Sequence, residues 1–288
     1  MKAFKTLWRE ALVGVLVLGN VMCWYAVASE TRGGVLTVNF LDVGQGDSIF
    51  IDGPNGVQIL IDGGKGNAVL RELSKVMPFY DRSIDVIIAT HPDQDHIEGL
   101  LGVLNRYSAL AFIEPDLRTT KPFQIELEQK AKKLGLRSFI AKTGQKISLG
   151  KGAYLEVIYP NVEVSHFEKD TNAASVVAIL RYGNTSFIFT GDLPKKQEDQ
   201  LTSQYGRALD VDVLKVGHHG SRTSSGSYFL ATVTPKIAVI SAGKNNRYGH
   251  PHKEALDNLV AIGAEIKNTA NIGRVTIKSD GGAITLEE

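Results

Sequence analysis

Four potential metal ligands lie within six residues in the first half of the chain. Residues 91–96 read HPDQDH, which gives the imidazoles of His91 and His96 and the carboxylates of Asp93 and Asp95. Imidazole and carboxylate are preferred ligands of zinc, and carboxylate oxygens also suit manganese and magnesium. An exposed polar turn with histidines by chance would explain one His-x-Asp pair, but it does not explain this density. The segment therefore predicts a metal site.

A buried strand and a helix are expected to hold these ligands. Residues 84–89 form an apolar run rich in β-branched side chains and bounded by polar ones, which is typical of a buried strand. Pro92 cannot continue a strand ladder, so the chain should turn there. Apolar residues then recur at helical spacing, at Ile97, Leu100 and Leu104. The ligands are thus expected on the loop that joins the strand to the helix.

Two strands expected in the second half of the chain also end in polar residues. The strand over 185–190 ends at Gly191-Asp192, which by itself is a weak signal. The strand over 211–216 is followed by His218 and His219 between two glycines, in a turn where neither ring can pack like a core residue. The alternation of strands and helices along the chain indicates an α/β layered fold.

Several motifs resemble those of a known family. The sequence His-x-Asp-x-Asp-His resembles the metallo-β-lactamase signature His-x-His-x-Asp-His, with Asp93 in place of the second histidine. The glycine-rich turn over 42–47, the Asn-x-x-Ser that begins at Asn172 and the segment 246–250 resemble the extracytoplasmic hydrolase domain of the DNA-uptake channel family ComEC. The similarity runs from about Leu36 nearly to the C-terminus. It implies a four-layer αβ/βα sandwich, the metallo-β-lactamase fold.

The resemblance also implies how two divalent metal ions would be bound. Six residues would form the two positions: His91 and Asp93 the first, Asp95 and His96 the second, Asp192 as the bridge, and His218 completing the second. His219 would then be free to stabilise a substrate oxygen or to donate a proton, although the two histidines could exchange these roles. Because two of the usual histidines are replaced, one position is rich in oxygen ligands. The ions are therefore expected to be zinc or manganese.

Further residues are expected around the ions, again by resemblance. Those assigned to catalysis are Asp95, His219 and His250. Those assigned to substrate binding are Asn172, which stands roughly where the superfamily has its third-motif histidine, Ser221 and Tyr248. Those assigned to structural support are Asp42, Asp47 and Asp62.

Composition and charge limit the partners of the chain. Of its 288 residues, 43% are hydrophobic and 22% are charged, which is ordinary for a globular protein. The net charge is +1, and the first 28 residues carry +2, so the remainder carries −1. A near-neutral body gives no electrostatic case for tight nucleic-acid binding, although four cations flank the expected pocket: Lys215, Arg222, Lys244 and Arg247. Cys23 is the one cysteine, so metal thiolate sites are excluded from the body.

The N-terminal segment, residues 1–28, predicts export of the body, residues 35–288. A basic start precedes an almost uninterrupted apolar run over residues 11–28. The small residues Ala26-Val27-Ala28 favour a cleaved signal peptide, whereas the length of the run and the pair Trp24-Tyr25 favour a membrane anchor. In both cases the body is expected outside the cytoplasmic membrane, either secreted or anchored.

The expected function is that of an exported metal-dependent hydrolase acting on phosphodiesters, with DNA as a candidate substrate. The first metal position lacks the three-histidine set of true β-lactamases, which counts against that activity. Two alternatives remain open: a hydrolase of small esters, such as phosphocholine or lactone compounds, and a non-catalytic module that retains the fold. The chain lacks the many membrane spans of a ComEC channel, so no transport of its own is expected, and no protein partner can be read from the sequence.

Overall fold

The computed structural model describes residues 2–30 and 33–287, with the backbone alone over 2–7 and 26–30. The chain separates into two compact units, Met1–Gly34 and Val35–Glu288. The first unit contains helix α1 (Lys2–Glu30), whose described apolar side chains are exposed. No helix among the described residues is long and apolar enough to cross a membrane. The expected cleavage pattern Ala26-Val27-Ala28 lies outside the residues whose side chains are described.

The body is built on two mixed β-sheets. The first has eight strands in the spatial order β15 (Ile284–Glu287), β14 (Val275–Ser279), β1 (Leu36–Phe40), β2 (Ile49–Asp52), β3 (Gln58–Ile61), β4 (Ser83–Ile88), β5 (Ser108–Glu114) and β6 (Arg137–Ile140). The second has seven, in the order β13 (Glu265–Asn268), β12 (Ile237–Ile240), β11 (Val213–Lys215), β10 (Thr185–Phe189), β9 (Val177–Tyr182), β8 (Ala153–Tyr159) and β7 (Lys146–Gly150).

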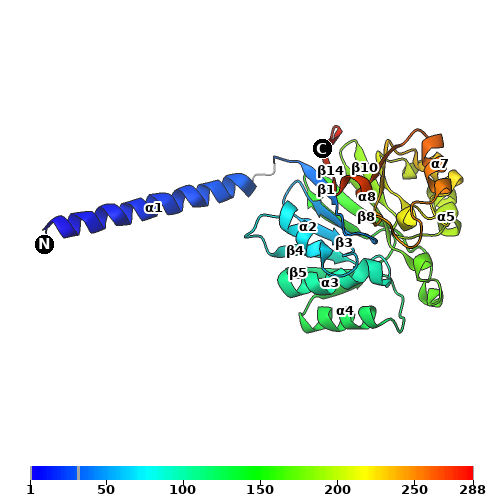
Figure 1. Cartoon of the computed structure of the whole chain (residues 1–288), viewed down its shortest axis with the longest axis horizontal. Helices are drawn as coiled ribbons and strands as arrows, with labels where there is room; N and C mark the ends of the chain where they lie inside the picture. Colours follow the sequence, from blue (N-terminus) through cyan, green and yellow to red (C-terminus); the bar gives the residue numbers. More distant parts are fainter. Residues whose placement is uncertain (1, 31–32, 288) are drawn as a thin grey trace. The chain divides into compact units, whose positions relative to one another are not determined.

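Helices cover the outer face of each sheet (Figure 1). The first sheet is covered by α2 (Ala68–Val76), α3 (Gln94–Arg106) and α4 (Pro122–Lys133). The second is covered by α5 (Lys195–Tyr205), α6 (Ser227–Val233) and α7 (Lys253–Ala261), and α8 (Thr269–Ile272) follows β13. Four single turns complete the body: η1 (Ser165–Phe167), η2 (Thr171–Ala174), η3 (Gly206–Leu209) and η4 (Gly217–Gly220).

Three layers of apolar side chains hold these elements together. One core lies between the two sheets and contains Phe40, Phe187 and Phe189, which are all buried. The other two lie between each sheet and its own helices. Burial of apolar surface is the main favourable term in folding, so this helix–sheet–sheet–helix order is what the pattern of buried residues requires. The prediction of a layered αβ/βα sandwich is confirmed.

Candidate metal centre

The ligand residues gather where strand ends of the two sheets meet. Strands β3 and β4 are parallel, and Asp62 and His91 lie just beyond their carboxyl ends. Strands β10 and β11 are also parallel, and they are followed by Asp192 and by His218-His219. The carboxyl ends of parallel strands lie at the same edge of a sheet. Packing the two sheets face to face then brings the four loops to one place.

A buried cluster of imidazoles surrounds the carboxylate of Asp192. Its Oδ1 lies 3.4 Å from His96 Nε2, and its Oδ2 lies 3.5 Å from His219 Nε2 and 3.9 Å from His91 Nε2. His219 Nε2 is also 3.5 Å from Oδ2 of Asp95. Ligand atoms about 2.0–2.2 Å from one tetrahedrally coordinated ion lie roughly 3.3–3.6 Å from each other. The three separations of 3.4–3.5 Å that link His96, Asp192, His219 and Asp95 therefore fit ligands of a divalent metal ion.

The same atoms lack other partners. Among the described residues, the Nε2 atoms of His91, His96 and His219 and Oδ1 of Asp192 are buried and make no hydrogen bond. Buried polar atoms in folded proteins are almost always paired, and an unpaired one costs about 1–3 kcal/mol. Four such atoms aimed at one another are best explained as metal ligands.

Hydrogen bonds on the far side of each ring direct these lone pairs inward. His96 Nδ1 donates to Asp62 Oδ2 at 2.7 Å, and His219 Nδ1 donates to the carbonyl of Ser241 at 3.0 Å. His91 Nδ1 lies 3.0 Å from Thr90 Oγ1, which itself donates to Asp62. A histidine that donates through Nδ1 presents the lone pair of Nε2, which is the arrangement found around metal-binding histidines.

Asp47 belongs to the back of the cluster. It groups geometrically with His96, Asp192 and His219, since one ligand atom from each of the four lies within 4.8 Å of the others. However, its Oδ2 is paired with Lys215 Nζ at 2.7 Å, and both residues are buried. Its Oδ1 lies 3.1 Å from His219 Nδ1 without hydrogen-bond geometry, on the side of the ring opposite to Nε2. Asp47 therefore supports His219 rather than facing the metal position.

The charges of the cluster favour a bound cation. Burial raises the pKa of Asp192, but His219 and His96 more than offset it and hold the pKa well below its usual value. Burial lowers the pKa of His219, but Asp192 and Asp47 more than offset it and raise the pKa to about 9. Burial raises the pKa of Asp95, which His219 and His96 again lower overall. The carboxylates thus attract positive charge strongly, and a divalent ion would supply it.

The backbone decides which of the paired histidines enters the cluster. His218 and His219 have φ angles of 48° and 54°, in the left-handed region that costs a non-glycine residue about 1–3 kcal/mol. This turn buries His219 and leaves the side chain of His218 26% exposed, with its Nε2 3.6 Å from Asp192 Oδ2. Because His219 lies beside Asp95, the geometry favours His219 over His218 for the second position. This is the exchange of roles that the sequence left open.

Asp93 lies at the edge of the centre and is held by a cation. Lys121 Nζ and Thr171 Oγ1 both donate to its Oδ1, each at 2.5 Å. Burial raises the pKa of Asp93, but His91 and the hydrogen bonds from Lys121 and Thr171 lower it overall. No motif in the sequence pointed to Lys121 or Thr171, which lie 28 and 78 residues from Asp93.

The residues expected to bind substrate lie around the centre at different depths. Asn172 Nδ2 is 3.5 Å from His218 Nδ1, and the buried Ser221 has its Oγ 2.9 Å from that of Thr223. The ring of His250 lies 5.5 Å from that of His218 and 5.6 Å from that of Tyr248. Burial, together with His219 and His218, lowers the pKa of His250 to about 4, so the ring is neutral at pH 7.

Two further predicted residues have local roles. Asp42 Oδ1 accepts a hydrogen bond from Gly44 N at 3.2 Å, which shapes the glycine-rich turn. Lys215, expected to flank the pocket as a surface cation, is fully buried beneath it. Lys215 lies in a short parallel strand whose other residues are apolar and buried. A strand buried on both faces leaves a lysine no route to solvent, so it must be paired inside.

A cavity opens beside the centre. It measures about 470 Å³ and is lined by Gln45, Lys65, Asp93, Gln94, Asp95, Asn246, Arg247 and Tyr248. Arg247 Nη2 donates to the hydroxyl of Tyr248 at 2.7 Å, and its guanidinium lies 4.9 Å from the centre of that ring. The cavity thus joins two carboxylates of the ligand motif to two cations.

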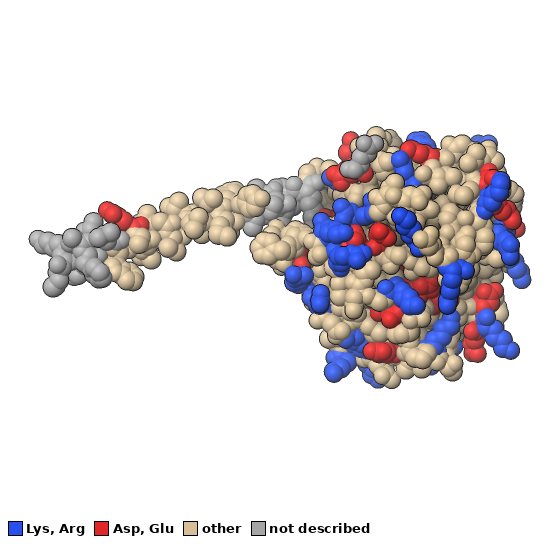
Figure 2. All heavy atoms as spheres, viewed as in Figure 1, with Lys and Arg blue, Asp and Glu red and all other residues tan. Residues whose placement is uncertain are grey.

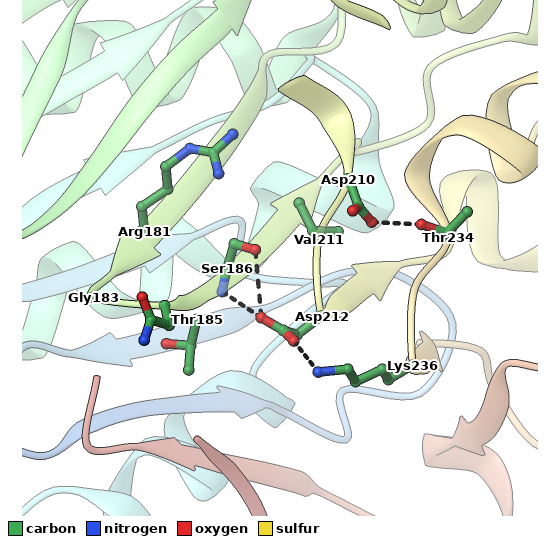
Figure 3. Close-up of a pocket in the computed structure, with 10 residues that line it drawn as sticks. Arg181, Gly183, Thr185, Ser186, Asp210, Val211, Asp212, Thr234 and Lys236 are labelled. Carbon is green, nitrogen blue, oxygen red and sulfur yellow. Dashed lines mark hydrogen bonds and ion pairs between the residues drawn. The ribbon is translucent and has the colours of Figure 1, made fainter. Parts of the chain in front are cut away.

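A second cavity, of about 400 Å³, lies at the opposite ends of strands β10, β11 and β12 (Figure 3). Its charged groups already have partners: Asp212 accepts from Lys236 Nζ at 2.7 Å and from the backbone N–H of Ser186 at 2.9 Å. Asp210 accepts from the hydroxyl of Thr234, and Arg181 donates to the carbonyl of Ala208 at 2.6 Å. Its described lining residues include no histidine. The carboxylates of the ligand motif therefore line the first cavity and not the second.

Comparisons with known proteins agree with this geometry. The family model of the metallo-beta-lactamase superfamily matches residues 41–244. The chain is 31% identical to ComE operon protein 3 of Bacillus subtilis, over 93% of this chain and 36% of that protein. It is 30% identical to Recombination protein 2 of Haemophilus influenzae, over 83% of this chain and 28% of that protein. It thus spans about a third of the length of these relatives.

A solved structure shows the same fold. The metallo-beta-lactamase fold protein YhfI from Bacillus subtilis superposes with a TM-score of 0.56 and 13% identity, over 85% of this chain and 99% of that one. At 13% identity this structural match shows the fold alone. The class of chemistry rests on the match to the family model. The chain therefore belongs to the metallo-beta-lactamase superfamily, as a metal-dependent hydrolase that resembles the competence proteins of the ComEC type.

Proposed function

We propose that this protein hydrolyses phosphodiester bonds, with DNA as a candidate substrate, on the outer side of the cytoplasmic membrane. One observation carries the proposal: the cavity beside the metal centre is lined by the cations Lys65 and Arg247 as well as by Asp93 and Asp95. A phosphodiester is an anion that needs both cations to hold it and metal ions to act on it. The names of the relatives, which refer to competence and recombination, support a nucleic acid as substrate.

The residues present suit two divalent ions, zinc or manganese. The set Asp95, His96, Asp192 and His219 would hold one ion, and His91 and Asp93 would contribute to a second beside the shared Asp192. When bound, such ions activate water as a nucleophile and neutralise the charge that develops on phosphate oxygens.

The surrounding side chains would orient the substrate. Arg247 is held in place by Tyr248, so its remaining N–H groups are available to a phosphate without further ordering. The neutral His250, whose buried Nδ1 has no hydrogen-bond partner in the described chain, can donate to or accept from a substrate oxygen. His218, partly exposed beside Asp192, stands where it can exchange a proton with the leaving group.

The charges on the face of the body in Figure 2 favour short substrates over long ones. On the face of the body shown in Figure 2, Lys and Arg side chains are interspersed with Asp and Glu and form no continuous strip. Binding of long polynucleotides normally depends on a row of phosphate contacts from basic side chains. A strand end, or a single phosphodiester group, requires only the two cations at the cavity.

A comparison of substrates tests the proposal. The full chain and its Asp95→Ala variant would be assayed with manganese and with zinc on bis-p-nitrophenyl phosphate, single-stranded DNA, a lactone and a β-lactam. We expect turnover of the phosphodiesters that Asp95→Ala abolishes and that Asp199→Ala, an exposed position on α5, leaves unchanged. Turnover of the lactone or the lactam alone would refute the phosphodiesterase assignment and keep the metal site. No turnover of any substrate, with no metal bound, would favour a non-catalytic module.

A further inference from the structure

The first metal position differs from the second by a lysine that already neutralises its carboxylate. Lys121 immediately precedes α4, and its ammonium donates to Asp93 Oδ1 at 2.5 Å and to Thr171 Oγ1 at 2.9 Å. Thr171, at the start of η2, donates to the same oxygen of Asp93. Three elements that are distant in the sequence thus meet on one carboxylate, and both hydrogen bonds fall on one of its two oxygens.

The position formed by Asp95, His96, Asp192 and His219 has no equivalent cation. Both carboxylates lie beside histidine rings, and the backbone N–H of Asp192 donates to the hydroxyl of Ser175. Arg247, which lines the cavity with Asp95, acts on it by charge without an ion pair or hydrogen bond to it in the described chain. Lys215 is paired with Asp47 behind His219. Neither carboxylate is therefore paired with a lysine in the way that Asp93 is.

The first position, at His91 and Asp93, also has fewer good metal ligands than the second. His91 Nε2 is buried and has no hydrogen-bond partner, so it remains available. Asn172, which stands where the superfamily usually has a histidine, has its amide nitrogen 3.5 Å from His218. Asp93 keeps Oδ2 free of hydrogen bonds to the described residues, but the ammonium lies one oxygen away. A fixed positive charge at that distance repels a divalent ion, less so where solvent screens it, and the side chain of Lys121 is 38% exposed.

We propose that Lys121 makes the two metal positions unequal: the position of Asp95, His96, Asp192 and His219 binds its ion tightly, and Lys121 weakens binding at the position of His91 and Asp93. This inference rests on the proposed metal-dependent function. In it, Lys121 acts through Asp93 and does not touch the metal. The charge of Lys121 thus offsets the charge of Asp93, the residue that stands where the superfamily signature has a histidine.

Titration of the metal-free full chain with Mn²⁺ tests this inference, with the free ion followed by electron paramagnetic resonance. Wild type should bind one equivalent tightly and a second weakly. Lys121→Met should tighten the second equivalent by about tenfold or more, or about 1.4 kcal/mol, and leave the first unchanged. Lys121→Arg keeps the charge and should behave as wild type, and so should Lys130→Met, which removes a lysine elsewhere on α4. Lys121→Gln gives a second neutral side chain should the methionine variant fold poorly.

The outcomes separate the inference from the proposal on which it rests. Two equivalents of equal affinity in wild type would overturn the inference and keep the metal centre. So would neutral variants whose second equivalent binds as in wild type or more weakly, because Lys121 would then serve only to orient Asp93. Thr171→Val removes a hydrogen bond from the same oxygen without changing charge, so it should not tighten the second equivalent. No bound ion in any of the proteins would overturn the metal centre itself together with this inference.

Discussion

Replacing Asp62 by asparagine should weaken metal binding while the body stays folded. Asp62 is fully buried just after β3, and its carboxylate accepts three hydrogen bonds. Thr90 donates through its backbone N–H at 2.8 Å and its hydroxyl at 2.6 Å, and His96 donates through Nδ1 at 2.7 Å. The φ angle of Asp62 is 58°, a left-handed conformation that asparagine adopts more readily than most residues. The backbone should therefore accept the change.

The size of the effect follows from these three bonds. If the amide nitrogen takes the place of Oδ2, it faces two donors, the Thr90 hydroxyl and His96 Nδ1. His96 can then accept from the amide only if its proton moves to Nε2. That shift removes the Nε2 lone pair that would bind the metal. If the nitrogen takes the place of Oδ1, one buried donor of Thr90 is left unpaired. In both orientations His96 loses a charged partner. Loss of such an outer partner typically costs 10–100-fold in metal affinity, about 1.4–2.7 kcal/mol, and an unpaired buried donor costs about 1–3 kcal/mol of stability.

Two measurements on the same protein separate these costs. Metal titration should show the affinity of the position at His96 falling by about 10–100-fold. Urea unfolding in the presence of a chelator should show a loss of about 1–3 kcal/mol. The control is Asp85→Asn, since Asp85 Oδ2 accepts a hydrogen bond from Gln58 N at 2.7 Å between the same strands, β3 and β4. This control should lose stability and keep its metal affinity. Unchanged metal affinity in Asp62→Asn, or an equal loss in the control, would refute the reasoning.

Three other predictions follow from the site and the N-terminal segment. His219→Ala should lose the tightly bound ion, whereas His218→Ala should keep it and lose turnover, as metal analysis and rate measurements on the same samples would show. The pKa of His250 falls from 6.5 to about 4 on folding, so between these pH values the unfolded chain takes up a proton that the folded one does not. Stability of the metal-free protein should therefore fall as the pH drops from 6.5 to 4, and less so in His250→Gln, as urea unfolding at each pH would reveal. A C-terminal reporter active only in the cytoplasm should stay dark, and a bright reporter would refute export.

The position of the ligand residues directly after apolar strands could be predicted from the sequence. An apolar strand that ends in a cluster of ligands, as at 84–96, must deliver those ligands to the sheet edge, and His91 and His96 are indeed buried there. Asp192 could be placed by the same reasoning because it follows the apolar strand that became β10. The layered fold followed from the alternation of strands and helices, which is a property of the sequence pattern alone.

The sequence could not show which of the adjacent residues His218 and His219 is buried in the metal centre. The choice depends on left-handed backbone angles at His218 and His219, which are uncommon outside glycine and which no local sequence pattern predicts for both residues. The contact between Lys121 and Asp93 could not be predicted either, because it depends on how α4 packs rather than on a local sequence pattern. The burial of Lys215 could have been foreseen, since its neighbours Val213, Leu214 and Val216 are all apolar and give the strand no exposed face at that point.

Because Lys215 is buried, fewer cations than expected can contact the phosphates of a long substrate. A strip of four cations along the pocket would have suited a strand of nucleic acid, but Lys215 is paired with Asp47 and cannot reach a phosphate. The cations that line the cavity are Lys65 and Arg247. Each phosphate contact to a single strand contributes about −0.7 to the slope of log affinity against log salt, so two contacts give a slope of only about −1.4. Such a weak dependence on salt is expected for binding of a strand end or a short phosphodiester. A protein that binds along a long strand makes more phosphate contacts and depends more steeply on salt. The selectivity of the site must then come from the metal centre and the shape of the cavity rather than from attraction to a polyanion.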